Sequence, residues 1–214
     1  NSASPIIPPD ENYAKWLTSS LYATASFGYK NLLFVDGTYR VDRSSNLPKT
    51  NNTYDYYSAT GSLILSELWK QNWLSFWKVR ANYAEVGSST VNYQLNNTYR
   101  VRGGFGSTGL VNQSYFLANP DLKPQRSKEV EFGMEAQFLK NRLGFDIAVY
   151  KTRTLDQIIN LPVSSATGYR TFLVNAGQIN NKGIEVQLNG TPIKNSNFSW
   201  DIDVNWSKNE NEVV

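Results

Sequence analysis

The chain of 214 residues contains no cysteine, no histidine and one methionine. Without cysteine there is no disulfide framework and no thiolate site. Without histidine there is no zinc site of the usual kind, no Ser-His-Asp triad and no histidine general base. These absences remove most enzyme chemistry. We therefore expect a protein that is not an enzyme, with no catalytic residues, no metal site and no cofactor.

The sequence also lacks a long hydrophobic run and a block of charge of one sign. The longest aliphatic run is Leu63-Ile64-Leu65, far short of the roughly twenty apolar residues of a transmembrane helix. The 21 basic and 18 acidic residues are nearly balanced and form no basic run, so no nucleic-acid partner is expected. A membrane β-barrel stays compatible with this composition, because it crosses the bilayer with only one face of each strand.

The sequence does contain regular alternation, most clearly in the stretch SKEVEFGMEAQFLKNRLGFDIAVY at 127–150. Every second residue from Val130 to Phe138 is apolar, and most of those between carry a carboxylate or an amide. After a turn at Lys140-Asn141, the alternation resumes from Leu143 to Val149. A period of two over about ten residues predicts two long antiparallel strands, each with an apolar and a polar face.

Strands of this length favour a membrane barrel. Strands of globular proteins usually run about five or six residues, whereas a tilted strand that crosses a bilayer needs about nine to eleven. We expect an all-β fold, an antiparallel transmembrane β-barrel segment of about eight strands. The strands are expected near residues 21–29, 33–42, 57–65, 79–83, 127–138, 143–155, 184–189 and 200–207.

The connections between these strands alternate in length. Short turns are expected at Lys30-Asn31, 69–76, Lys140-Asn141 and 191–197, and long loops at about 43–55, 86–126 and 156–180. Short turns on one rim and long loops on the other are typical of an outer-membrane barrel, whereas in a sandwich there is no reason for short and long connections to alternate along the chain. Residues 1–18, rich in Pro, Ser and Asn, are interpreted as the end of an extracellular loop, and residues 19–214 as barrel strands with their loops.

Tryptophans gather at the short-turn end of this pattern, at Trp69, Trp73, Trp77 and Trp200. An aromatic girdle at a membrane interface would place them there, the alternative being ordinary core packing. Charged residues of the polar faces, such as those in 129–135, could not enter an apolar core at acceptable cost. We expect these charges to face a wet lumen or a plug.

Five aromatic residues in the longest loop are the candidate ligand-binding residues: Tyr93, Tyr99, Phe105, Tyr115 and Phe116. Exposed aromatic side chains in a polar loop can stack on a sugar or hold a partner protein. A loop that packs on its own aromatic residues would show the same composition, so both interpretations stay open.

Two groups of residues resemble motifs of a known family. The segment 119–124 (NPDLKP), followed by Ser127-Lys128-Glu129 and Glu131-Phe132-Gly133, resembles the NPxLKPE-S-x-E-x-E-x-G signature of TonB-dependent outer-membrane receptors. The segments PVSSATGY at 162–169 and NAGQINNKGIE at 175–185 are similar to the SusC/RagA branch. Gln125 stands where the family usually has glutamate, at a loop–strand junction that leaves the fold assignment intact.

The resemblance implies a barrel of about 22 strands, of which eight would be roughly a third of the wall. It implies a plug domain, absent from this chain, and energised import of a bulky nutrient, a glycan or a peptide, across the bacterial cell outer membrane. The implied partners are the remainder of the same barrel and its plug, a SusD-like surface lipoprotein, TonB through a missing N-terminal region, and outer-membrane lipid. The start without methionine and the end just after a strand suggest a segment of a longer chain.

Two alternatives stay open at this point. A passive eight-stranded barrel or porin would require the chain to be complete and closed. A soluble carbohydrate-binding or adhesin β-sandwich would use the long loops to bind its ligand, and its strands would bury the apolar faces between two sheets.

Overall fold

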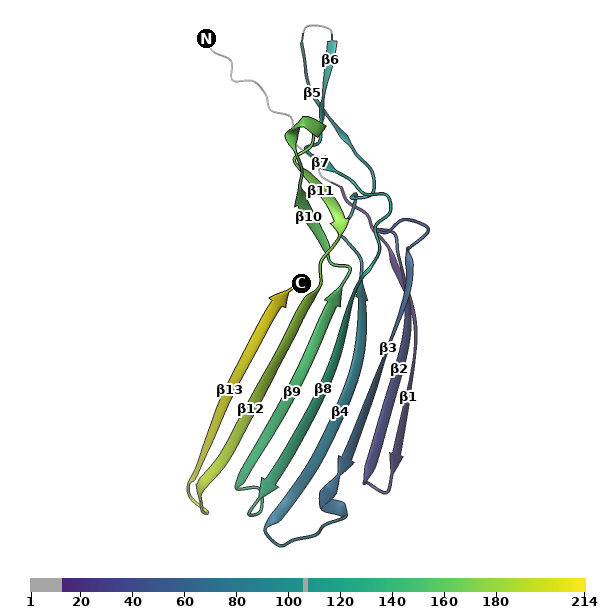
Figure 1. The fold of residues 1–214 in the computed structure, drawn as a ribbon. Helices are drawn as coiled ribbons and strands as arrows, with labels where there is room; N and C mark the ends of the chain where they lie inside the picture. The colour runs from purple at the N-terminus through teal and green to yellow at the C-terminus, as the bar shows by residue number, and fades with distance from the viewer. Residues whose placement is uncertain (1–12, 106–107) are drawn as a thin grey trace, which may run out of the picture.

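The computed structural model describes residues 13–105 and 108–214, except the side chains of residues 100–105. Its main feature is one curved sheet of eight long strands (Figure 1), in the order β1-β2-β3-β4-β8-β9-β12-β13. All neighbouring strands of this sheet are antiparallel. The strands are β1 (Thr18–Tyr29), β2 (Leu33–Ser44), β3 (Thr53–Ile64), β4 (Leu74–Ser88), β8 (Gln125–Phe138), β9 (Leu143–Leu155), β12 (Ile179–Lys194) and β13 (Ser199–Val213).

The strands are long, and several exceed their expected bounds. β4 has 15 residues and β12 has 16, although the alternation predicted only 79–83 and 184–189. β12 runs near its start through the polar residues 180–182, where the contrast between the two faces is lost, and the start of β4 carries a register shift between Leu74 and Phe76 that breaks the alternation. A β-bulge between Gly190 and Ile193 also shifts the register of β12 against β13, so the alternation breaks at its other end.

Smaller elements lie beyond the rim where the long connections meet (Figure 1). They form a two-stranded hairpin, β5-β6, and a three-stranded sheet in the order β10-β11-β7. Their bounds are β5 (Tyr99–Phe105), β6 (Thr108–Gln113), β7 (Phe116–Leu117), β10 (Ile158–Pro162), β11 (Thr171–Asn175) and the 3-10 helix η2 (Ser165–Thr167). A second 3-10 helix, η1 (Leu65–Glu67), follows β3 at the opposite rim. The sequence patterns did not predict these small strands.

Two of the short turns use residues with left-handed backbone. Lys30 and Asn31 have φ of 49° and 51°, and the amide of Leu32 donates to the carbonyl of Tyr29 over 2.9 Å. This is the hairpin turn with two positive φ values whose twist suits antiparallel strands. The turn between β8 and β9 is longer than the expected Lys140-Asn141 pair, because 139–141 all have positive φ and the amide of Arg142 donates to the carbonyl of Phe138.

The strand register aligns apolar residues across the whole sheet. One row of paired residues crosses all eight strands: Tyr29, Leu33, Leu63, Val79, Met134, Ile147, Val186 and Trp206. The neighbouring row, displaced by one residue along each strand, lies on the opposite face. From β4 to β13 it consists of Lys78, Glu135, Asp146, Gln187 and Asn205. The sheet therefore has one apolar face and one polar face.

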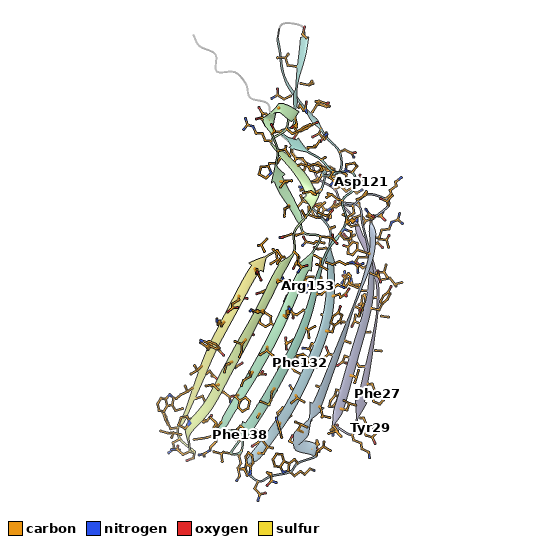
Figure 2. The ribbon with its side chains drawn as sticks, viewed as in Figure 1. Phe27, Tyr29, Asp121, Phe132, Phe138 and Arg153 are labelled. Atoms are coloured by element: carbon orange, nitrogen blue, oxygen red, sulfur yellow. The ribbon has the colours of Figure 1, made fainter. Side chains whose placement is uncertain are left out.

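The apolar face is the exposed one. Phe132 is 58% exposed and Trp206 is 54% exposed, whereas the side chains of Arg80 and Glu131 on the polar face are only 21% and 24% exposed. In the described part of the chain no second sheet covers the apolar face. Phe132, on this face, lies near mid-height of the sheet (Figure 2). This distribution is the reverse of a soluble sandwich and is what a lipid-facing wall requires.

Tryptophan side chains do line the short-turn end of the sheet. The rings of Trp69 and Trp77 lie 5.9 Å apart, and Trp73 stacks on Phe138 at 5.8 Å. Trp69, Trp73 and Trp200 are each about half exposed, which suits an interfacial position better than core packing. Among residues 13–105 and 108–214, no helix is both long and apolar enough to cross a membrane.

Candidate functional site

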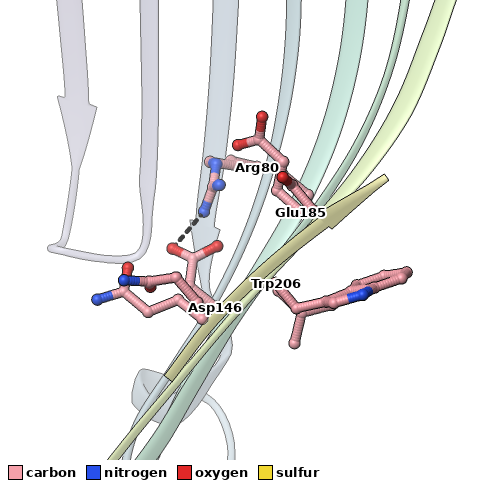
Figure 3. Close-up of a pocket in the computed structure, with 9 residues that line it drawn as sticks. Arg80, Asp146, Glu185 and Trp206 are labelled. Atoms are coloured by element: carbon pink, nitrogen blue, oxygen red, sulfur yellow. Dashed lines mark hydrogen bonds and ion pairs between the residues drawn. The ribbon is translucent and has the colours of Figure 1, made fainter. Parts of the chain in front are cut away.

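The polar face is a network of ion pairs on the inside of the curved sheet. The Arg80 guanidinium contacts Asp146 with Nη1 to Oδ2 at 2.9 Å, and Glu131 with Nε to Oε1 at 3.2 Å. Lys78 Nζ lies 2.8 Å from Glu135 Oε2. In Figure 3, Arg80, Asp146 and Glu185 lie on one side of the sheet, whereas Trp206 points to the other.

Gly133 allows Arg80 to connect three strands. Arg80 on β4 is paired with Gly133 on β8, and a Cβ atom at that position would collide with the Arg80 guanidinium. With no side chain there, the guanidinium crosses β8 and reaches Asp146 on β9. The glycine of the Glu131-Phe132-Gly133 motif therefore provides the space for this bridge.

Two open hollows lie on this inner face. The first is lined by Arg80, Asp146, Glu185, Gln187 and Asn205, among others, and the second includes Glu135 and Asp203. Glu185 and Asp203 have no ion-pair partner within the described ranges, so this part of the wall carries an excess of negative charge. No group of three potential metal-ligating residues occurs in those ranges. This inner face can therefore contact water or the polar surface of another part of the protein.

The long connections pack together at the opposite end from the short turns. We call residues 45–52, 89–105, 108–124 and 156–178 the loop assembly. Its small apolar core consists of Leu47, Leu122 and Leu173 from the three connections, together with Tyr54 at the start of β3. Leu122 is completely buried, and it comes from the NPDLKP motif. The three connections are thus one packed unit on the rim of the sheet.

Asn175 joins two of these connections. Its side-chain amide donates to the carbonyls of Lys123 and Asp156, each over 2.8 Å, and its Oδ1 accepts from the amide of Lys123 over 2.8 Å. Asn51 donates to the Leu122 carbonyl over 3.2 Å, so the first connection is attached at the same place. Hydrogen bonds and apolar packing both hold the loop assembly together.

The candidate aromatic residues have different surroundings. Tyr93, Tyr99 and Tyr115 are exposed, while Phe116 is partly buried against the apolar core. The Tyr93 hydroxyl accepts from the amide of Lys15, and the Tyr115 ring lies 4.4 Å from the Arg170 guanidinium. The side chain of Phe105 lies outside the described residues. Among the described side chains, no candidate ring stacks on another candidate.

Sequence reasoning missed the residues that build the loop assembly. In the sequence, Leu122 and Asn175 stand out only as members of the two motif segments, and Arg170 does not stand out at all. A single apolar residue between polar ones, or a lone asparagine, gives no periodic signal. The available clue was their position inside the segments 119–124 and 175–185.

Comparison with known proteins identifies the family. The model of the TonB dependent receptor-like, beta-barrel family matches residues 2–212. The chain belongs to this family. It is 29% identical over 211 residues to TonB-dependent receptor P39 of Formosa agariphila, covering 92% of this chain and 19% of the relative. It is 27% identical over 207 residues to TonB-dependent receptor SusC of Bacteroides thetaiotaomicron, covering 91% of this chain and 20% of SusC.

Solved structures agree with this assignment. The RagAB peptide importer in its closed-closed state superimposes with a TM-score of 0.87 at 25% identity, over 94% of this chain and 22% of that chain. The chain thus spans about a fifth of the length of the relatives it matches.

Family membership confirms the resemblance and the fold class: the chain is an all-β segment of a TonB dependent receptor-like β-barrel, and its wall strands are antiparallel. The barrel is not closed within this segment, because β1 and β13 are the two ends of the sheet and do not pair with each other. The eight-stranded closed barrel and the β-sandwich are therefore not the architecture of this chain. The family is one of receptors and is consistent with nutrient import across the outer membrane.

Proposed function

We propose that this chain is part of the barrel wall of a SusC-like, TonB-dependent importer. The observation that carries the proposal is the distribution of side chains on the two faces of the sheet. Phe132 and Trp206 are exposed on the apolar outer face, and Arg80 forms ion pairs on the polar inner face. A wall of this kind separates lipid from a polar lumen. The names of two similar proteins support import as the function, because one is SusC and the other is a peptide importer.

The proposed orientation places the loop assembly outside the cell and the short turns in the periplasm, as in other outer-membrane barrels. Residues 1–18 are then the end of an extracellular loop, although 1–12 lie outside the described residues, and residues 19–214 are wall strands with their loops. The plug, and the region through which TonB would act, belong elsewhere in the whole protein. The inner face, with its excess of carboxylates such as Glu185 and Asp203, would line the lumen around the plug.

The loop assembly is the proposed surface for nutrient capture and for a SusD-like lipoprotein lid. It is packed and therefore has a defined shape, and Tyr93, Tyr99 and Tyr115 are exposed on it. Tyrosine offers a flat apolar face and a hydroxyl, which suits both a sugar ring and a peptide. We propose a bulky glycan or peptide as the nutrient, with Phe105 and Phe116 contributing to the same surface.

The test removes the β5-β6 hairpin from the full-length receptor. Residues 100–112 are replaced by Asn-Gly, which closes the Tyr99–Gln113 pair with a short turn. We expect co-purification of the lipoprotein or uptake of the nutrient to fall by roughly tenfold or more, a loss of about 1.4 kcal/mol of binding. Membrane insertion, measured by resistance of the barrel to SDS at room temperature, should be unchanged.

A double variant, Tyr99→Ala with Tyr115→Ala, separates the aromatic side chains from the hairpin itself. It should reduce capture in the same direction, because it removes two exposed rings and leaves the backbone in place. Unchanged uptake and lid binding in both variants would contradict the proposed role of the loop assembly. Lost insertion with normal uptake per inserted molecule would show that the hairpin serves folding.

A further inference from the structure

The outer face carries a group of basic residues just above its apolar band. We call Arg126 and Lys128 on β8, with Lys151 and Arg153 on β9, the basic patch. Arg153 lies at the end of β9 nearest the loop assembly (Figure 2). The function proposed above does not use these residues, since they lie on the lipid-facing side of the wall.

The strand register places all four side chains on the outer face. Lys128 is paired with Arg153, and Lys151 is paired with Val130, which belongs to the apolar face. The residues between them point inward, as shown by the hydrogen bond from Thr152 Oγ1 to Glu129 Oε2 over 2.8 Å. Alternation along both strands therefore fixes the direction of the basic patch.

The height of the patch is fixed in the same way. The outer pair Phe132–Val149 is apolar, and the next outer pair toward the loop assembly is Val130–Lys151. On β8 and β9 the basic residues thus begin one pair above the last outer pair in which both residues are apolar. A cation at that level has its charge in the headgroup layer while its alkyl stem covers the edge of the hydrocarbon.

The patch is only partly neutralised by the protein. Lys128 Nζ lies 2.9 Å from Glu85 Oε1, and Arg126 lies 3.6 Å from the other oxygen of the same carboxylate, which is 4% exposed. Arg126 also lies 3.7 Å from Asp55. Lys151 and Arg153 are exposed and have no ion-pair partner within residues 13–105 and 108–214. Two positive charges are therefore available at the headgroup level.

A neighbouring group shows what a neutralised arrangement looks like. Lys182 on β12 and Lys208 on β13 lie on the same face near the same rim. Both contact Glu210, at 3.0 Å and 2.9 Å. This group has its own counter-charge, whereas Lys151 and Arg153 do not.

We infer that the basic patch binds the phosphate of a lipid headgroup in the outer leaflet, with Lys151 and Arg153 as the principal contacts. Phosphate is the anion that an Arg fork and a Lys ammonium bind well, and lipid headgroups hold it at this depth. Glu85 fixes Lys128 and Arg126 beside the site. The inference rests on the proposed orientation, in which this rim faces outward.

The test uses the full-length receptor in detergent and a phosphorylated lipid A as the probe. The double variant Lys151→Gln with Arg153→Gln is compared with Lys182→Gln with Lys208→Gln, which loses the same charge from the neutralised group. We expect the first variant to bind the probe roughly 10- to 30-fold more weakly, by native mass spectrometry, and the second to match the unmodified receptor. Lipid A from which the phosphates have been removed should bind all three proteins equally weakly.

Three outcomes would overturn the inference. Equal loss in both double variants would mean a general charge effect, and equal binding of the two forms of lipid A would exclude phosphate. Displacement by millimolar inorganic phosphate as effective as by the lipid would show a site for free phosphate. Nutrient uptake is measured in parallel and should not change in either double variant. A failure of the import proposal can then be distinguished from a failure of the lipid-binding inference.

Discussion

At the scale of single residues, position in the alternation decides the surroundings of a side chain. Asp146 and Ile147 are adjacent in sequence, yet the first contacts Arg80 on the inner face and the second belongs to the apolar row of the outer face. The chemistry of each face is consistent over many strands. The effect of a substitution should therefore depend first on which face of the sheet the position occupies, and only then on the residue that is introduced.

The clearest test of this dependence compares two adjacent positions on β12. Val186→Arg would place a charge on the lipid-facing side near mid-height, with an expected loss of about 2 to 4 kcal/mol of unfolding free energy. Gln187→Arg is the matched control, because it adds the same side chain at the same height in the hollow beside Asp146. Urea unfolding of the full-length receptor in lipid measures both. Equal losses would contradict the assignment of the faces.

The face to which each side chain points was predictable from the sequence, but the ion pairs on the inner face were not. Alternation alone predicted that seven side chains point outward: Phe132, Phe138, Phe145, Ile147, Val149, Ile202 and Val204. Phe132, Val149, Ile202 and Val204 are exposed, whereas Phe138, Phe145 and Ile147 are partly buried. The bridge from Arg80 across Gly133 to Asp146 depends on which residues are opposite each other on three strands. That information requires the register, which no single-strand pattern contains.

At the scale of elements, the loop assembly depends on a few polar contacts between connections. Asn175→Ala would remove three hydrogen bonds, to both backbone groups of Lys123 and to the carbonyl of Asp156. At about 1 kcal/mol for each bond, local opening should become roughly 100-fold more frequent. Hydrogen exchange at the Lys123 amide measures this, with the barrel strands unchanged.

Asn160→Ala on β10 is the control for this prediction. Asn160 is exposed and forms no side-chain hydrogen bond within the described ranges, so its loss should leave the exchange of Lys123 as it is. Equal protection in the Asn175 and Asn160 variants would mean that the apolar core around Leu122 holds the assembly by itself.

Sequence patterns predicted the wall strands better than the connections between them. The alternation identified all eight wall strands, because each must present an apolar face to lipid over many residues. β10 and β11 have five residues each and pack within a small assembly, so neither needs a long alternating pattern. For the same reason, the sequence could not separate the partly buried Phe116 from the exposed Tyr115.

At the scale of the whole molecule, the sheet is an incomplete wall. β1 and β13 are exposed along their entire length, and each has a neighbour on one side only. Roughly half of the backbone donors and acceptors of each edge strand are therefore without a strand partner in this segment. In hydrocarbon each unsatisfied group costs several kcal/mol, so other polypeptide must pair with both edges.

We accordingly predict that residues 1–214 produced alone will aggregate in water. The apolar outer face has no cover, and both edges are free to pair with other copies. Size-exclusion chromatography with and without detergent measures this, with the full-length receptor in detergent as the control that should remain monodisperse.

Closure of this segment into a small barrel would relieve both edges, but the inner face opposes it. An eight-stranded barrel has an interior just wide enough for side chains. Closure would bring Glu185 and Asp203, which lack ion-pair partners among the described residues, close to Glu131 and Glu135. Burying these carboxylates together without added cations is unfavourable. A monodisperse, water-soluble, β-rich monomer of residues 1–214 would therefore contradict both the aggregation prediction and the assignment of the outer face to lipid.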